Sequence, residues 1–166
     1  ACAAGRYQDE PGQSLCVDCA EGRFRNAGGA AYANCTACPS GKHQVEVGKT
    51  SCDACAAGTR GVAGVGVAFA EHCVACAAGQ AQPKEAQTTC NDCAAGTHAA
   101  QNGTSECEEC AAGRFAAEVG TVACQACGAG TASGEARSKT CTACAAGRYQ
   151  DEPGQSLCVD LSLIHI

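Results

Sequence analysis

Cysteine is the residue with the greatest chemical potential in this chain, and it recurs at fixed spacings. Eighteen of the 166 residues are cysteine, and sixteen of them form eight Cys-x-x-Cys pairs, from Cys16-Val17-Asp18-Cys19 to Cys141-Thr142-Ala143-Cys144. Paired cysteines of this kind bind zinc as thiolates, carry out thiol redox catalysis or form structural disulfides. The three chemistries make different demands on the rest of the sequence.

The zinc interpretation has partial support. Two Cys-x-x-Cys pairs about fifteen residues apart approach the four-thiolate zinc pattern. However, the residue after each pair is Ala in six of eight cases, where zinc knuckles usually have Gly. The histidines His43, His72 and His98 show no regular ligand spacing, and four-thiolate sites would leave Cys2 and Cys158 unused. A cytosolic zinc-thiolate array therefore stays as the alternative, and we expect no metal site.

Redox catalysis requires a cysteine of lowered pKa, typically at a helix N-terminus in a βαβ fold. Nothing in the sequence predicts such a helix, and eight equivalent copies indicate architecture. The scattered Ser, Asp and His residues form no triad. We therefore expect no catalytic residues, no cofactor and no enzyme activity.

The cysteines divide the chain into tandem modules, the signature of a repeat array. Each module has a first cysteine and, in seven of nine cases, thirteen residues before its second cysteine. The first cysteines are Cys2, Cys19, Cys38, Cys55, Cys76, Cys93, Cys110, Cys127 and Cys144. The second cysteines are Cys16, Cys35, Cys52, Cys73, Cys90, Cys107, Cys124, Cys141 and Cys158. We number the modules 1 to 9 over residues 2–18, 19–37, 38–54, 55–75, 76–92, 93–109, 110–126, 127–143 and 144–160.

The apolar content is too low for an ordinary core. Leu, Ile, Val and Phe number 19 in total, and Trp and Met are absent. Such a chain needs another stabilising device, and this density of cysteine is typical of disulfide scaffolds in oxidising compartments. Pairing the two cysteines within each module uses all eighteen thiols and closes loops worth roughly 3 kcal/mol each. The rival scheme, which joins each Cys-x-x-Cys pair to the next one, leaves Cys2 and Cys158 unpaired.

Glycine and turn residues predict the local structure. A glycine lies three residues after the first cysteine in all nine modules, which indicates a positive φ or the close approach of another segment. Further along the module, Pro153-Gly154 suits a type II turn and Asn102-Gly103 a type I′ hairpin turn. We therefore expect a small disulfide-rich repeat array of short β-hairpins and turns, with little or no helix and an elongated, rod-like form.

Two side-chain positions stand out beside the cysteines. An aromatic residue occurs five residues after the first cysteine in four modules, and we expect it to cover the adjacent disulfide: Tyr7, Phe24, Phe115 and Tyr149. Asn102-Gly103-Thr104 is an N-glycosylation acceptor on a predicted turn. Asn102 is therefore the glycosylation candidate.

Charge and hydropathy exclude two classes of partner for this segment. The formal net charge is −6, and no basic stripe is present to bind nucleic acid. No apolar run approaches the length of a membrane span, so we expect no membrane contact within residues 1–166. A parent protein of greater length could still be anchored.

At this level the pattern Cys-x-x-Gly-x-[Tyr/Phe]…Gly…Cys-x-x-Cys resembles the ephrin type A/B receptor-like cysteine-rich repeats, within the growth-factor-receptor cysteine-rich group. It is also similar to the first submodule of tumour-necrosis-factor-receptor domains. The resemblance covers residues 1–160 and implies that cysteines thirteen residues apart bond to each other. Pro39 keeps the proline that the family often has after the first cysteine, and the other modules depart from it.

The resemblance implies a segment of an extracellular or cell-surface protein. We expect it to act as a structural spacer or a protein-binding ectodomain, with protein or glycan ligands that the sequence does not identify.

The last six residues, 161–166, break the repeat. Leu161-Ser162-Leu163-Ile164-His165-Ile166 stands where Cys16-Val17-Asp18 is followed by another cysteine, and it holds both isoleucines of the chain. Its sequence resembles the translation of a transposon-library sequencing adapter. We interpret it as foreign to the natural protein, whose repeat we expect to continue past Asp160. Residues 143–160 also repeat residues 1–18 without change, as a higher-order repeat or an assembly error would produce.

Overall fold

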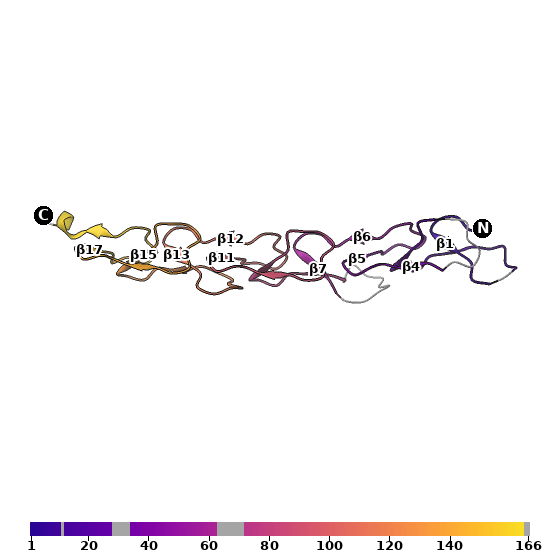
Figure 1. Ribbon diagram of the computed structural model, residues 1–166, viewed down its shortest axis with the longest axis horizontal. Coiled ribbons are helices and arrows are strands. Elements are labelled where there is room, and N and C mark those ends of the chain that lie inside the picture. The colour runs from indigo at the N-terminus through magenta and orange to yellow at the C-terminus, as the bar shows by residue number, and fades with distance from the viewer. Residues whose placement is uncertain (11, 28–33, 63–71, 165–166) are drawn as a thin grey trace. The chain divides into compact units, whose positions relative to one another are not determined.

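The computed structural model describes residues 1–10, 12–27, 34–62 and 72–164 (Figure 1). Within them, each module contains one antiparallel hairpin of two short strands. The paired strands are β1 (Arg6–Tyr7) with β2 (Val17–Asp18), β3 (Arg23–Phe24) with β4 (Thr36–Ala37), β5 (Lys42–His43) with β6 (Asp53–Ala54), β7 (Thr59–Gly61) with β8 (Cys73–Ala75), β9 (Gln80–Ala81) with β10 (Asn91–Asp92), β11 (Thr97–His98) with β12 (Glu108–Glu109), β13 (Arg114–Phe115) with β14 (Gln125–Ala126), β15 (Thr131–Ala132) with β16 (Thr142–Ala143) and β17 (Arg148–Tyr149) with β18 (Val159–Asp160).

The expected small disulfide-rich array with little helix is confirmed. Among the described residues, a short 3₁₀ turn, η2, spans Leu161–Ile164. None of the described residues belongs to a helix with the length and hydropathy of a membrane span. In η2, the Leu161 N–H donates to the Gly147 carbonyl, the bond that a first cysteine makes in other modules.

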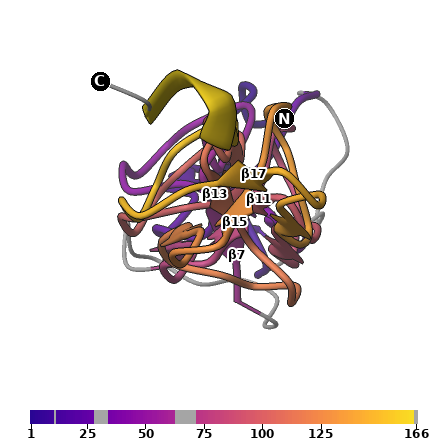
Figure 2. The same ribbon diagram turned by 90° about the vertical axis from the view of Figure 1, so that its left-hand side faces the viewer.

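The chain forms two compact units, which we describe separately. Unit 1 contains Ala1–Ala75 and Gln82–Cys90, and unit 2 contains Cys76–Ala81 and Asn91–Ile166. Within unit 2, the hairpins from β11 to β18 follow one another in chain order in Figure 1. Seen from the side that carries the C-terminus, β11, β13, β15 and β17 lie near the centre and the loops project outward (Figure 2).

The first cysteines form the core. Their side chains are almost completely buried in eight modules, whereas nearly all the second cysteines are half-buried. The largest fully buried side chains of the described residues are Cys19, Cys38, Cys55, Cys76, Cys93, Cys110 and Cys127. Disulfide sulfur therefore fills the interior that Leu, Ile and Phe fill in ordinary domains.

The glycine three residues after the first cysteine was expected to have a positive φ or a close backbone neighbour. The structure shows both roles. It occupies the third position of a turn, for example Ala111-Ala112-Gly113-Arg114, in which the Arg114 N–H donates to the Ala111 carbonyl over 3.0 Å. Gly113 has φ +82°, as a type II turn requires at that position. The same turn recurs in all nine modules, and its glycine has a positive φ in each.

The same glycine joins neighbouring modules through the backbone. The Gly96 N–H donates to the Ala116 carbonyl of the next module, and the Gly96 carbonyl accepts from the Cys110 N–H, over 2.8 and 3.0 Å. A third bond runs from the Gly120 N–H of module 7 back to the Cys93 carbonyl of module 6 over 2.8 Å. Equivalent bonds recur within unit 1, so most of the hydrogen bonds that join the described modules are made by backbone atoms.

Contacts also reach the module after next. A Cβ built on Gly113 would overlap the carbonyl oxygen of Gly154, which belongs to module 9. A Cβ on Gly79 would likewise overlap the carbonyl oxygen of Gly120. In unit 1, a Cβ on Gly5 would overlap the carbonyl oxygen of Gly48. Each such glycine therefore lacks room for any side chain, in addition to its positive φ.

The mid-module turn differs from the sequence prediction at Asn102. A type I′ turn needs a positive φ at both central residues, but here only Gly103 has one, at +79°. The prediction of a type I′ turn was wrong because the Gly103 N–H bonds to the Cys76 carbonyl of the preceding module, and this contact sets the turn. Gly154 has φ +81°, as the predicted type II turn requires, and Pro11 lies outside the described residues.

Three glycines allow the two roles to be tested separately. Gly113 has the positive φ and the overlap, Gly130 has only the positive φ of +78°, and Gly128 has neither. Gly128→Ala should be neutral or stabilising by up to about 1 kcal/mol, since seven other modules carry Ala there. Gly130→Ala should cost about 1–2 kcal/mol from backbone strain alone, and Gly113→Ala should cost more than Gly130→Ala.

The measurement is amide hydrogen exchange of the residue bonded to each glycine carbonyl. Cys127 reports on Gly113, and Cys144 reports on Gly130. Equal effects of Gly113→Ala and Gly130→Ala, which share the positive φ, would show that the close approach does not contribute to stability.

Ala86 provides a test of the mid-module turn. It occupies the position of Gly103 and Gly120, and it has φ +58°, where a side chain is strained. Ala86→Gly should therefore raise the local opening free energy by about 1 kcal/mol, measured from exchange of the residue 86 amide, which bonds to the Cys55 carbonyl. The control is Ala100→Gly, at an exposed residue without positive φ, which should destabilise slightly. A loss of stability in Ala86→Gly would contradict the strain argument.

Candidate functional site

In each of the eight modules whose disulfide geometry is described, the bridge joins the first and second cysteine. The Cα–Cα distances are 5.3–5.8 Å, within the usual disulfide range. The pairs are Cys2–Cys16, Cys19–Cys35, Cys38–Cys52, Cys55–Cys73, Cys93–Cys107, Cys110–Cys124, Cys127–Cys141 and Cys144–Cys158. Cys76 and Cys90 are also disulfide-bonded, so no cysteine is free. These sixteen cysteines therefore bond across their hairpins, and none of them bonds to the other cysteine of its Cys-x-x-Cys pair.

A glutamine clamp, which was not predicted from the sequence, closes several loops. In module 3, the buried Gln44 amide donates to the Ser51 carbonyl over 3.0 Å, and its Oε1 accepts from the Glu46 N–H over 3.0 Å. Gln82 and Gln150 make the same pair of bonds, and Gln8 repeats it with Leu15 and Glu10. The available signal was Gln at a fixed offset, six residues after the first cysteine, in four modules.

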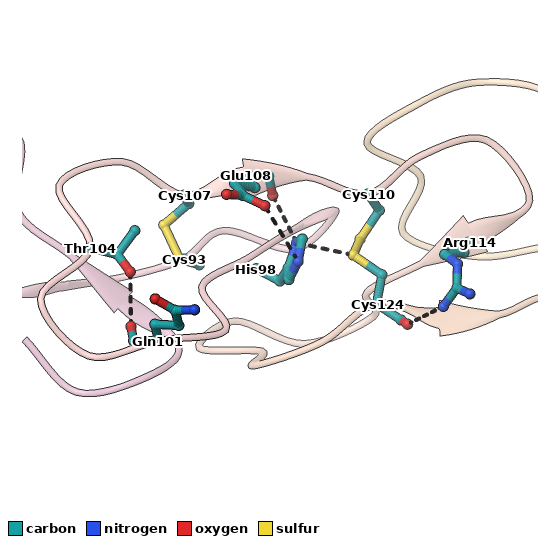
Figure 3. A network of polar contacts seen from close by, with 9 residues as sticks. All are labelled: Cys93, His98, Gln101, Thr104, Cys107, Glu108, Cys110, Arg114 and Cys124. Atoms are coloured by element: carbon teal, nitrogen blue, oxygen red, sulfur yellow. Dashed lines mark hydrogen bonds and ion pairs between the residues drawn. A yellow bond between two sulfur atoms is a disulfide. The ribbon is translucent and has the colours of Figure 1, made fainter.

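In modules 3 and 6, the residue five positions after the first cysteine lies against the next module's bridge. In module 6 this residue is His98, and its Nδ1 lies 3.4 Å from Sγ of Cys124 in module 7. Figure 3 shows the imidazole between the bridge of its own module and the Cys110–Cys124 bridge. In module 1 the position is Tyr7, which lines a surface depression together with Cys35 of the next module. The four aromatic residues expected to cover a disulfide are all half-buried.

Two further groups hold the His98 ring. Its Nδ1 lies 3.2 Å from the Glu108 carbonyl, so Nδ1 carries the hydrogen, and Nε2 lies 3.9 Å from the Glu108 carboxylate (Figure 3). The His98 side chain is 20% exposed. An imidazole is thus fixed between a sulfur atom and an acidic side chain.

His43 repeats this arrangement in unit 1. Its Nδ1 lies 3.4 Å from Sγ of Cys73, whose bridge partner is Cys55. His43 and His98 both stand five residues after a first cysteine, so the statement that the histidines lack a regular spacing was wrong for these two. The error came from counting spacings between histidines, when the relevant register is the offset within the module. His72 lies elsewhere in module 4, and its Nε2 has no hydrogen-bond partner among the described residues.

The glycosylation candidate Asn102 lies on an exposed turn. Its amide oxygen accepts from the Ala78 N–H over 2.8 Å, and the Thr104 hydroxyl donates to the Gln101 carbonyl over 2.8 Å. The carboxamide is therefore oriented while the turn stays accessible.

Two equivalent surface ion pairs cross the hairpins of modules 1 and 9. Arg6 bonds Asp18 over 2.6 Å, and the equivalent Arg148 bonds Asp160 over 3.1 Å. A hydrogen bond from Lys49 to Glu46 raises the pKa of Lys49 above its ordinary value. Exposed pairs of this kind contribute little to stability, so they orient side chains and do not form a charged site.

Comparison with known proteins identifies the repeats. The family model described as tyrosine-protein kinase ephrin type A/B receptor-like matches residues 26–63 and 96–139. No curated protein matches the chain. The two matched segments contain the Cys-x-x-Gly turn, the hairpin and the within-module bridge described above. Residues 26–63 and 96–139 therefore match the cysteine-rich repeats of the ephrin type A/B receptor-like family.

Proposed function

We propose that the chain is a segment of an extracellular or cell-surface protein that acts as a structural spacer and presents its loops to a protein partner. The single observation that carries this proposal is that all eighteen cysteines are disulfide-bonded. Disulfides on this scale are typical of proteins in oxidising compartments.

The spacer role follows from how the modules are joined. Among the described residues, most hydrogen bonds between modules join backbone atoms, chiefly of the Cys-x-x-Gly turn and the mid-module turn, within each unit. Loop side chains are therefore free to vary without loss of the array, as in other repeat proteins.

The loops also expose apolar side chains that could contact a protein. Leu15 is 78% exposed, Leu157 70% and Val119 66%. These residues contribute nothing to the cysteine core, so their exposure is a surface property. A glycan ligand has less support, since the chain has only three Tyr, three Phe and no Trp, and four of these six aromatic side chains are half-buried.

The alternative function, a zinc-thiolate array, needs free Cys-x-x-Cys thiolates. The disulfides leave none. We propose a binding or spacing role in which the cysteines act as structural bridges.

The thiol state tests this function. The full chain, secreted behind a cleavable leader, should show fewer than one titratable thiol per chain in denaturant, and peptide mapping should link Cys93 to Cys107. Full reduction should unfold it, because little apolar surface is buried; the amide NMR spectrum should then lose its dispersion. Mostly free thiols with stoichiometric zinc would establish the alternative, and a Cys90–Cys107 link would overturn the within-module scheme.

Glycosylation tests the compartment independently. In a host that glycosylates secreted proteins, Asn102 should carry a glycan because its turn is exposed. Asn102→Gln and Thr104→Ala should remove the mass increment, whereas Thr104→Ser should keep it, since Ser preserves the acceptor motif. Secreted chain with an unmodified Asn102 would contradict this expectation.

A further inference from the structure

We propose that His98 with Cys110 and Cys124, and His43 with Cys55 and Cys73, form two redox-gated zinc sites. Each site is closed while its cysteines form a disulfide, and it binds Zn²⁺ once a dithiol reductant opens that bridge. This proposal goes beyond the spacer function and does not depend on it.

The donor atoms already converge. In each group, the imidazole nitrogen and the two sulfur atoms lie within 4.8 Å of one another. The His98 Nδ1–Cys124 Sγ distance of 3.4 Å is close to the roughly 3.6 Å expected for nitrogen and sulfur bound tetrahedrally to one zinc. The corresponding distance from His43 to Cys73 is also 3.4 Å. Breaking the S–S bond and separating the sulfurs to about 3.8 Å completes a His-Cys₂ set.

An acidic residue stands opposite each histidine. His98 is paired with Glu108 across β11 and β12, and His43 is paired with Asp53 across β5 and β6. In the other seven hairpins the residue opposite this position is Val, Thr, Asn or Gln. Histidine and acid thus occur together in two modules and in no other.

This coincidence fits the outer contacts of a zinc site. A zinc-bound histidine almost always donates its second ring N–H to a carboxylate, a backbone carbonyl or water, which fixes the tautomer. With Nδ1 on the metal, the hydrogen resides on Nε2, and Nε2 of His98 lies 3.9 Å from the Glu108 carboxylate. The Nδ1 contact with the Glu108 carbonyl is given up in that step.

The redox step balances with a dithiol as the reductant. Its two thiols supply two electrons and two protons; the Cys110–Cys124 bond breaks, and one S–S bond forms in the reductant. Zn²⁺ then displaces one proton from each cysteine thiol to solvent, leaving a neutral Zn²⁺–dithiolate unit. Cys124 is the accessible sulfur, since it is half-buried while Cys110 is 0% exposed. Water completes the fourth coordination position.

The scaffold itself supplies a conservative test variant. Phe115 occupies the position of His98 in module 7, so His98→Phe and His43→Phe install a residue that the repeat accommodates. The double variant His43→Phe/His98→Phe removes both imidazoles and keeps all eighteen cysteines.

The experiment treats the full oxidised chain with two equivalents of a water-soluble phosphine, which replaces the dithiol because it competes less for metal. Zn²⁺ is present, and thiols are alkylated before and after a chelator is added. Mass mapping should find Cys55, Cys73, Cys110 and Cys124 protected until the chelator is added, with about two zinc ions per chain. Cobalt in place of zinc should give the visible absorption of a tetrahedral thiolate complex. The double variant should lose both metal ions and the protection.

A gain-of-function variant completes the test. In the double variant, Phe115→His with Gln125→Glu recreates the histidine–acid pair beside the Cys127–Cys141 bridge. One zinc ion should return, and Cys127 and Cys141 should become the protected thiols. Zinc bound equally by the double variant, or protection centred on Cys93 and Cys107, would overturn the proposal.

Discussion

The close approach of backbone to backbone at one glycine is the constraint on which this structure depends. In module 7, the Gly113 N–H and carbonyl both bond to neighbouring modules, and its Cα faces the Gly154 carbonyl with no space for a side chain. These contacts give the array its order within each unit. The buried first cysteines then supply the interior, since the chain has few other apolar residues to bury.

The sequence predicted the hairpins well because their determinants are local. A glycine three residues after the first cysteine and a second cysteine at the base of the hairpin are both readable in one module. The turn at Asn102 was not predictable in the same way. Its conformation depends on a bond from Gly103 to Cys76 in the preceding module, and single-module reasoning does not include that partner.

The candidate site shows the same division. Cysteine spacing predicted which residues form bridges, but the position of His98 against Cys124 joins two modules and appears only when the repeats are packed. The Gln44 clamp was visible as a recurring offset, yet glutamine has no strong local preference that would have marked it. For such side chains, the offset of a residue from the first cysteine of its module is therefore more informative than its spacing from residues of the same type.

The backbone hydrogen bonds between modules, which we call backbone joints, also explain how one scaffold carries different side-chain chemistry at equivalent positions. Five residues after the first cysteine, the chain has Tyr7, His98 or Ala132 with the same strand register. An imidazole can be placed against a bridge at this position without a change in the hairpin. Variation there alters the surroundings of the disulfide while the joints between modules stay the same.

Amide hydrogen exchange of the oxidised chain tests the central claim most directly. The N–H groups of Gly96, Cys110 and Gly120 all bond to carbonyls of adjacent modules, whereas the N–H of the exposed Ala117 has no such bond among the described residues. If backbone joints hold the modules together, the three bonded amides should exchange slowly and at similar rates, far below that of Ala117. Exchange of Gly96, Cys110 and Gly120 as fast as Ala117 would contradict this account.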